Sequence, residues 1–505
     1  MLSNGEKIMK ILLVYPEFPD TFWSFKHALS FIRKKASSPP LGLLTIASML
    51  PAGWEKKLVD MNVQQLRDKD LEWADFVFIS AMTVQRESVK KVIRRCIETG
   101  VKVVAGGPLF TTEPQEFEGV DHFILNEAEI TLAHFLKDLD AGRPGKIYST
   151  DEYADIQKTP PPMWNLTRFK EYTTMAMQYS RGCPFNCDFC NVTALLGHRM
   201  RVKTSAQIVT ELNTLYKSGW RSGIFFVDDN LIGNKKVLKN DLLPALIEWR
   251  KDKSGIYFHT EVSINLADDP ELMELMVKAG FNQVFIGIET PDETNLEECS
   301  KRQNLNRDMV ADVKKIQRAG MQVQGGFIVG FDHDSPSTFQ HLLEFIQKSG
   351  IATAMVGILQ APIGTMLYER MQKAGRLVKH ISGDNVNGST NIITRMNIDV
   401  LKERYRKLIR QIYSPELYYQ RVKILLQEYR RKKIKPHINF DMIWRNFIAL
   451  IRSIFQLGIF GKERKHYWNL FFWTLFNKPG MFPLAITYSI FGFHFRKVSE
   501  QHVTK

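Results

Sequence analysis

Short apolar runs alternate with amphipathic stretches over the first 140 residues of the chain. Each run is four to six residues long, which predicts a β-strand, and the stretches between them have the apolar period of a helix. The predicted strands are Lys10–Tyr15, Lys57–Asp60, Phe76–Ser80 and Val101–Ala105, and the predicted helices are Leu41–Leu50 and Glu87–Thr99. Because alternating strands and helices form a parallel sheet that is covered on both faces, we expect a doubly wound α/β domain over residues 8–140.

A second alternation begins after a polar, Pro-rich stretch. Three consecutive prolines at 160–162 favour extended backbone, so we interpret residues 141–172 as a linker. Six strand patterns then alternate with helical patterns over residues 173–395, which predicts a partial (β/α)6 barrel whose chemistry lies at the carboxyl ends of its strands. The predicted strands are Thr174–Tyr179, Gly223–Val227, Tyr257–Val262, Gln283–Ile288, Val323–Val329 and Thr353–Leu359, and the predicted helices are Ser205–Ser218, Pro270–Ala279, Arg307–Ala319 and Ser335–Lys348.

The strand signal stops near residue 395, so we expect a helical C-terminal extension over residues 396–505. Two helical patterns, Val400–Ile412 and Glu416–Arg431, are followed by two stretches rich in Trp, Phe, Ile and Leu, Ile443–Phe460 and Trp468–Phe476. A membrane-spanning helix needs about 20 uninterrupted apolar residues, and basic residues interrupt these stretches. The extension therefore either lies at a membrane surface as amphipathic segments or packs on the barrel as a helical cap.

Charge is distributed unevenly along the 505 residues. The chain has a formal net charge of +14, and Leu401–Lys505 holds 21 Lys and Arg against 6 Asp and Glu, while the first 400 residues hold 47 against 48. A basic tail favours an acidic membrane face or nucleic acid as a partner. Because this tail is aromatic and aliphatic and contains no recognisable RNA-binding module, nucleic acid is the weaker interpretation.

Three of the five cysteines fall within eight residues. This spacing does not suit a disulfide framework, and the N-terminus lacks a secretory signal, so we expect a cytoplasmic protein. Cys96 lies on a predicted helix and is expected to be buried, and no role is predicted for Cys299.

The clustered cysteines lie in the segment Arg181–Cys190 (RGCPFNCDFC), directly after the first barrel strand. Four-iron clusters prefer thiolate ligands, and the three thiolates of Cys183, Cys187 and Cys190 would leave one iron open to a substrate or cofactor. The alternatives are a structural zinc site and chance.

The C-x-x-x-C-x-x-C loop, with Phe189 before its last cysteine and a six-unit βα barrel after it, resembles the radical S-adenosylmethionine (SAM) superfamily. The resemblance implies a 4Fe-4S cluster, cleavage of SAM to a 5′-deoxyadenosyl radical, and a reductant such as ferredoxin or flavodoxin. It also implies that Phe189, Asp229, Glu289, Gly325 and Gly326 contribute to SAM binding. The alternatives are a helix cap or turn for the acids of FVDDN, a surface salt bridge for Glu289, and tight packing for the two glycines.

The N-terminal domain resembles the cobalamin-binding branch of the same superfamily through PPLGL at 39–43, GGP at 106–108 and NEAE at 126–129. Cobalamin would then bind at the turns that follow the strands, where a doubly wound sheet holds its ligand. The expected cobalamin-binding residues are Ser80, Thr83, Gly106, Gly107 and Glu127. No D-x-H-x-x-G motif follows the first strand, and His27 lies in a different context, so the alternative is a degenerate domain that binds nothing.

The layout resembles the hopanoid methylase and bacteriochlorophyllide methyltransferase group, which implies cobalamin-dependent C-methylation of an unactivated carbon on a lipid-like substrate. Ring closure, carbon–carbon coupling or oxidation of such a substrate is the alternative without methyl transfer, and tRNA modification is a weaker one. The tail adds the hypothesis of a peripheral location on the inner face of the membrane. The sequence indicates neither the substrate, nor catalytic residues beyond the cluster, nor the oligomeric state.

Overall fold

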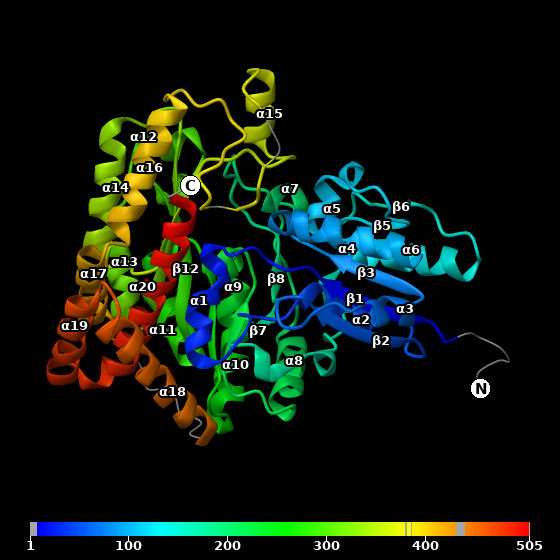
Figure 1. Cartoon of the computed structure of the whole chain (residues 1–505), viewed down its shortest axis with the longest axis horizontal. Helices are drawn as coiled ribbons and strands as arrows, with labels where there is room; N and C mark the ends of the chain where they lie inside the picture. Colours follow the sequence, from blue (N-terminus) through cyan, green and yellow to red (C-terminus); the bar gives the residue numbers. More distant parts are fainter. Residues whose placement is uncertain (1–7, 379–380, 385, 431–439, 504–505) are drawn as a thin grey trace.

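The structure is a computed structural model that describes residues 8–378, 381–384, 386–430 and 440–503. Figure 1 shows two α/β units side by side, the N-terminal one at the right of the view and the barrel at its centre, with the C-terminal helices at the left and in front of the barrel. In the described part of the chain, no helix is both long and apolar enough to cross a bilayer.

The N-terminal unit is a six-stranded sheet in the order β2-β1-β3-β4-β5-β6, and every neighbouring pair in it is parallel. The last two strands of the sheet, β5 and β6, and the helix α6 between them were not predicted. The edge strand β6 lies beyond residue 140, where the domain was expected to end. Strands of three and two residues are too short to show a periodic pattern. The strands are β1 Lys10–Tyr15, β2 Glu55–Asp60, β3 Phe76–Ser80, β4 Lys102–Gly106, β5 His122–Ile124 and β6 Ile147–Tyr148, and the helices are α2 Leu41–Met49, α3 Asp68–Trp73, α4 Arg86–Thr99, α5 Pro108–Thr112 and α6 Ala128–Asp140.

The Pro-rich stretch is packed against both units instead of running free between them. Trp164 and Tyr172 are each only 1% exposed. The hydroxyl of Tyr172 donates to the Asp60 carboxylate at 2.9 Å, and Tyr172 forms a parallel bridge with Ala36. The prolines set an extended path, as predicted, but buried aromatic side chains fix that path on the surface of the first sheet.

The second unit is an open, parallel six-stranded sheet in the order β14-β13-β12-β11-β10-β7, as the (β/α)6 pattern predicted. Along β11 the even-numbered residues are buried against the helices, whereas Tyr257, His259 and Glu261 are only partly buried and face the interior of the barrel. The strands are β7 Thr174–Met177, β10 Gly223–Phe226, β11 Tyr257–Val262, β12 Phe281–Glu289, β13 Gln322–Val329 and β14 Ala354–Ile358, with a small hairpin of β8 Ser180–Arg181 and β9 Arg201–Val202. The helices are α7 Val192–Leu196, α8 Ser205–Lys217, α9 Lys235–Val237, α10 Leu243–Trp249, α11 Pro270–Ala279, α12 Glu293–Glu298, α13 Met309–Ala319, α14 Pro336–Ser349 and α15 Met366–Lys373.

The C-terminal extension is helical, as predicted. The predicted helix that ends at Arg431 stops at Glu428 in the structure, and Arg431 lies outside the described residues. The last helix was not predicted: it packs on α16, α17 and α19, with Tyr488 and Phe495 buried. The helices are α16 Ile398–Ile412, α17 Pro415–Glu428, α18 Phe440–Ser453, α19 Arg464–Asn477 and α20 Phe482–Val503.

A short N-terminal segment, which includes α1 Lys26–Leu29, leaves the first unit and packs on α20 beside the barrel (Figure 1). The indole of Trp23 donates to the Met355 sulfur at 2.9 Å and lies edge-on to Phe285, whose ring centroid is 5.5 Å away. Phe22 stacks on Phe495 of α20 at 4.3 Å. The first and last helical segments of the chain thus share one apolar core with the barrel.

Candidate functional site

The three clustered cysteines lie on the loop between β8 and α7, at the carboxyl end of β7. The β8–β9 hairpin holds the start of this loop, where the Cys183 amide donates to the Gly197 carbonyl at 3.2 Å. Gly182 has φ of +92°, and a Cβ there would lie 2.6 Å from the Arg199 carbonyl oxygen. Glycine is therefore required immediately before Cys183.

The thiols of Cys183, Cys187 and Cys190 are not in disulfides. Burial raises the pKa of Cys183 and raises that of Cys190 to about 12, and the neighbouring Cys187 thiol acts in the same direction. Three free thiols on one short loop can supply the thiolate ligands of an iron–sulfur cluster with one open iron.

The two acids of FVDDN have different surroundings. Asp228 is fully buried and accepts from the Tyr179 amide at 3.1 Å and the Ser180 hydroxyl at 2.5 Å. It therefore holds the chain between β7 and the cysteine loop, which is the turn role that the sequence left open. Asp229 is half-buried, burial raises its pKa to about 6, and its charge acts on Cys190, so Asp229 lies beside the cysteine loop.

Glu289 ends β12 with φ of +64°, a left-handed conformation that costs free energy for a residue with a side chain. Its carboxylate is buried and accepts from the Lys301 ammonium at 2.7 Å. A Cβ at Gly287 would lie 2.3 Å from the Glu289 Oε1, so the glycine of GIET gives this ion pair its space. The salt bridge expected as the alternative for Glu289 is present, but it lies in the interior of the site and not on the surface.

Two charged residues of the site were missed from the sequence. Lys301 lies close to the thiols of Cys187 and Cys190, and its charge is 5.8 Å from the centre of the Phe189 ring. Glu261 faces the barrel interior from β11, and burial, followed by the charges of Asp229 and Asp228, raises its pKa to about 8. The alternation along Tyr257–Val262 could have revealed Glu261, because it places a carboxylate on the inward face of a strand.

This arrangement predicts how stability depends on pH. A carboxyl whose folded pKa is raised is protonated in the native protein, so its contribution to stability is complete below the unfolded value of about 4.3 and is lost as the pH rises toward 8. We expect Glu261→Gln to raise the melting temperature of the cofactor-free chain at pH 8, with a gain that falls with pH and vanishes below about pH 4. Differential scanning fluorimetry across this range measures the difference; a gain that is constant with pH would contradict the assignment.

The glycines of GGFIVG pack tightly against aromatic rings. Added Cβ atoms would lie 2.8 Å from the Phe327 ring at Gly325 and 2.7 Å from the Phe285 ring at Gly326. Tight packing, the alternative stated from the sequence, is therefore present at both glycines. Phe189, within the cysteine loop, packs against a small apolar cluster that includes Leu359.

Four of the expected cobalamin residues lie at or just after the carboxyl ends of β3 and β4. Ser80 ends β3, and a Cβ at Gly107 would lie 2.6 Å from its hydroxyl oxygen. Glycine at this position therefore lets the turn after β4 pass close to the end of β3, at the carboxyl ends of the strands, where a doubly wound sheet holds its ligand. Thr83 follows the end of β3, and a Cβ at Gly383, which lies after the last barrel strand, would be 2.9 Å from the Thr83 Cβ.

Glu127, expected to contact cobalamin, is buried in an ion-pair network between the two units. It is 5% exposed, and its two oxygens accept from Arg201 at 2.6 and 2.7 Å. The Ala154 amide donates to it at 2.8 Å, and Arg181 lies 3.4 Å away while also pairing with Glu129 at 2.7 Å. The NEAE motif therefore ties the first unit to the hairpin that carries the cysteine loop.

His27, which lies outside any cobalt-ligand motif, pairs with Asp20 at 2.7 Å. Its ring lies 5.5 Å from that of His494 on α20. These side chains join the N-terminal segment to the last helix.

A doubly wound parallel sheet, joined to a partial barrel with three free thiols at the carboxyl end of its first strand, is the arrangement expected of a cobalamin- and SAM-dependent radical enzyme. Three family descriptions match the chain in this order: B12 binding domain over residues 33–136, Radical SAM superfamily over 177–346, and a domain of unknown function, DUF4070, over 365–505.

Two relatives match nearly the whole chain. An uncharacterized methyltransferase of Synechocystis is 37% identical over 97% of this chain and 92% of its own length. The hopanoid C-2 methylase of Rhodopseudomonas palustris is 33% identical over 92% of this chain and 89% of its own. The chain belongs to the family of cobalamin-dependent radical SAM methyltransferases.

Solved structures share the fold at low sequence identity. The cobalamin-dependent SAM radical enzyme OxsB has a TM-score of 0.62 at 14% identity and covers 99% of this chain and 80% of its own. The methyltransferase TsrM of Kitasatospora setae has a TM-score of 0.57 at 14% identity and covers 74% of this chain and 80% of its own. The predicted fold class is confirmed, and the protein is a C-methyltransferase whose cofactors are a 4Fe-4S cluster, SAM and cobalamin.

Proposed function

We propose that this enzyme methylates an unactivated carbon of an apolar, polycyclic lipid of the hopanoid type. The observation that carries the proposal is the 33% identity with a hopanoid C-2 methylase over 92% of the chain, which includes the helical extension as well as the two cofactor units. Bacteriochlorophyllide methyltransferases are 23% and 24% identical over 75% and 82% of the chain, which makes a tetrapyrrole the second candidate substrate.

The proposal assigns roles to the residues of the site. Cys183, Cys187 and Cys190 hold the cluster, and Asp229 and Glu289 bind the polar groups of SAM. Ser80, Thr83, Gly106 and Gly107 hold cobalamin, and Glu127 positions the two units. When they are bound, the cluster supplies the electron that cleaves SAM, and cobalamin supplies the methyl group. The proposed domains keep the boundaries predicted from the sequence. Residues 8–140 bind cobalamin, residues 141–172 connect the two units, residues 173–395 carry out the radical chemistry, and residues 396–505 form the helical extension.

Lys301 is expected to act both on the SAM-binding Glu289 and on the cluster thiols. Its buried ammonium neutralises Glu289 and lies beside two of the cluster thiols, whose thiolate forms it would stabilise. A reductant such as ferredoxin or flavodoxin delivers the electron in this proposal. In this proposal the basic, aromatic tail binds the inner face of the membrane, where an apolar substrate is dissolved.

A direct test uses anaerobically reconstituted enzyme with cobalamin, a chemical reductant and SAM labelled in its methyl group. We expect label in a pentacyclic hopanoid and none in a bacteriochlorophyllide, with product detected by mass spectrometry of the lipid extract. Label in the tetrapyrrole alone would replace the substrate class. Full activity in a preparation without cobalt would overturn the cobalamin-dependent assignment itself.

A further inference from the structure

Exposed large apolar side chains are concentrated on one part of the C-terminal extension. Of the 19 such side chains among the described residues, 10 lie between residues 443 and 476. Five of them follow one another at intervals of four residues along α18 and the π-helical segment Ile454–Ile459 after it, so they form a single stripe. The ten, called the apolar face below, are Ile443, Trp444, Phe447, Ile451, Phe455, Ile459, Phe460, Phe472, Leu475 and Phe476.

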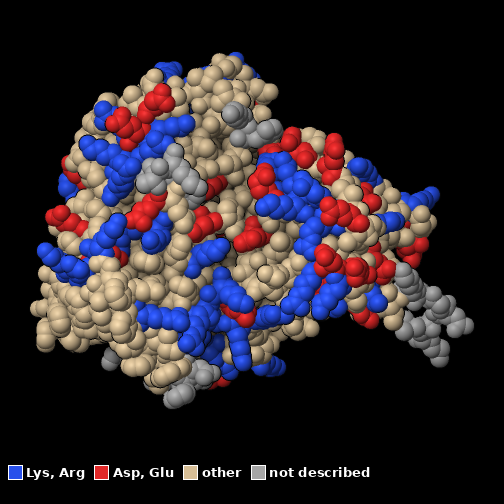
Figure 2. Space-filling model, viewed as in Figure 1, with Lys and Arg blue, Asp and Glu red and all other residues tan. Residues whose placement is uncertain are grey.

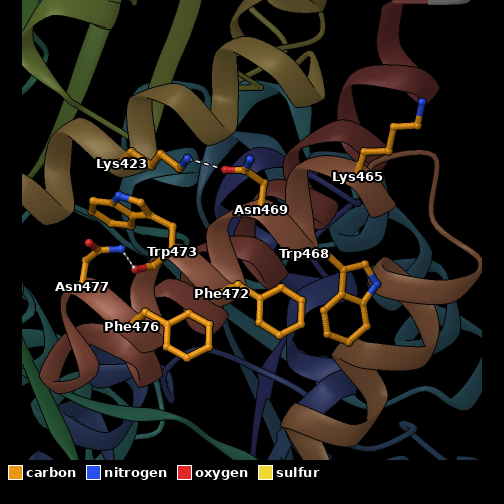
Figure 3. A pocket seen from close by; sticks show the side chains of 8 residues that line it. All are labelled: Lys423, Lys465, Trp468, Asn469, Phe472, Trp473, Phe476 and Asn477. Carbon is orange, nitrogen blue, oxygen red and sulfur yellow. Dashed lines mark hydrogen bonds between the residues drawn. The ribbon is translucent and has the colours of Figure 1, made fainter.

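The part of this face on α19 is a row of aromatic rings. Phe472 stacks with Trp468 at 5.5 Å and lies 6.3 Å from Phe476 in a near-parallel arrangement. Figure 3 shows these three rings on one side of α19, with Lys423 and Lys465 on the other side of a shallow hollow that they line together. Phe476 is 78% exposed, so its ring contributes little to the folded core.

Charged groups next to this face are almost all positive. Between residues 443 and 478 the chain has six Lys and Arg and one acid, Glu463. Glu463 is 4% exposed and pairs with Arg496, whereas Lys462, Arg464 and Lys465 are exposed. Figure 2 shows a broad uncharged area over α19, at the lower left of the view, with Lys and Arg side chains along its margin.

A second basic group comes from the other end of the chain. The run Arg33–Lys35 directly follows the turn Ser30–Ile32, on which α18 packs. The charge of Arg445 on α18 is near enough to Lys34 to contribute to the lowered pKa of that lysine, after burial as the main cause. Both ends of the stripe thus have positive charge beside exposed apolar rings.

We propose that the apolar face is a docking surface for a bilayer that contains anionic lipid. Aromatic and aliphatic side chains enter the boundary between headgroups and acyl chains, and neighbouring Lys and Arg bind the negative lipid headgroups. This surface lies on α18, α19 and the segment between them, whereas α20 is packed in the core. The inference rests on the proposed function, because an apolar substrate gives the enzyme a reason to bind the membrane.

Charge distinguishes a bilayer from a second copy of this chain. A symmetric dimer through this face would bring Lys462, Arg464 and Lys465 of one copy close to the same residues of the other. No exposed acid between residues 443 and 478 could pair with them. Like charges oppose such a dimer, whereas an anionic surface satisfies them.

The experiment uses the full-length holoenzyme and co-sedimentation with vesicles. We compare vesicles of phosphatidylcholine alone with vesicles that contain phosphatidylglycerol, at low and high salt. We expect binding to the anionic vesicles that weakens with salt, and a loss of about tenfold or more in the triple variant Phe447→Asp, Phe460→Asp, Phe476→Asp. These side chains are at least 50% exposed, so the variant keeps its fold. The matched control is Val400→Asp, an exposed apolar residue in the first turn of α16, where a carboxylate suits the helix dipole.

A second variant tests the electrostatic part. Lys462→Glu, Arg464→Glu, Lys465→Glu together should remove the preference for anionic vesicles and leave only weak binding that does not depend on salt. Unchanged vesicle binding in the aspartate variant would overturn the proposal. So would a dimer of the unsubstituted enzyme, measured by light scattering, if the aspartate substitutions dissociate it into monomers. Vesicle binding together with no methylated hopanoid would instead reject the proposed substrate and keep the docking surface. Methylation of detergent-dissolved hopanoid without vesicle binding would reject the docking surface and keep the proposed substrate.

Discussion

Replacement of Cys187 by alanine is expected to abolish methyl transfer. Cys187 is the most buried of the three loop thiols and lies between the other two, so its loss leaves too few protein ligands for a four-iron cluster. We expect the iron content of the reconstituted protein to fall from about four atoms per chain to a small residue. Iron and sulfide analysis, the visible absorption of the cluster and the yield of methylated product measure the effect.

Cys299 provides the matched control for this substitution. It is 1% exposed, and its carbonyl accepts from the Asp188 amide within the cysteine loop at 3.1 Å, so it is a buried cysteine close to the same site. We expect Cys299→Ala to keep its iron, because three ligands from the loop are sufficient. Loss of iron in Cys299→Ala would mean a cluster with four cysteine ligands and would contradict an open iron for SAM.

Glu127→Ala is expected to cause the largest loss of stability. Removing this buried carboxylate leaves Arg201 without its bidentate partner and weakens the hold on Arg181, two residues before Cys183. Breaking a buried ion pair from one side costs about 3–5 kcal/mol, because the remaining charge stays desolvated. Urea-induced unfolding, followed by tryptophan fluorescence, measures the loss, and faster proteolysis within residues 149–172 would localise it to the junction of the two units.

An exposed carboxylate in the same region serves for comparison. Glu152 lies on the surface, two residues before Ala154, whose amide donates to Glu127, and Glu152→Ala should change the free energy of unfolding by less than about 0.5 kcal/mol. If Glu127→Ala were as mild as Glu152→Ala, the network would not stabilise the junction. If Glu127→Ala instead kept its stability but lost cobalamin, Glu127 would be the ligand contact that the sequence suggested.

Most of the strands and the order of the three regions could be predicted, because each long strand or helix has its own periodic pattern. The cysteine loop could also be predicted, because the three proposed cluster ligands, Cys183, Cys187 and Cys190, are close in the sequence. The strands His122–Ile124 and Ile147–Tyr148 were missed, because two or three residues carry no period. Phe482–Val503 was missed because its apolar residues surround the helix, which has no single polar face.

The sequence by itself determined the class of chemistry: three thiolates on one short loop before a βα repeat, with a doubly wound domain ahead of it. Only the tertiary structure decided which charges meet. Lys301 and Glu289 are twelve residues apart and Glu127 and Arg201 are 74 apart, and each pair forms in a buried site where a carboxylate needs a partner. Likewise, the basic, aromatic tail was evident in the sequence, but folding decided that α20 enters the core while α18 and α19 keep their rings in solvent. Local patterns specify local structure, whereas burial and pairing depend on contacts between segments far apart in the chain.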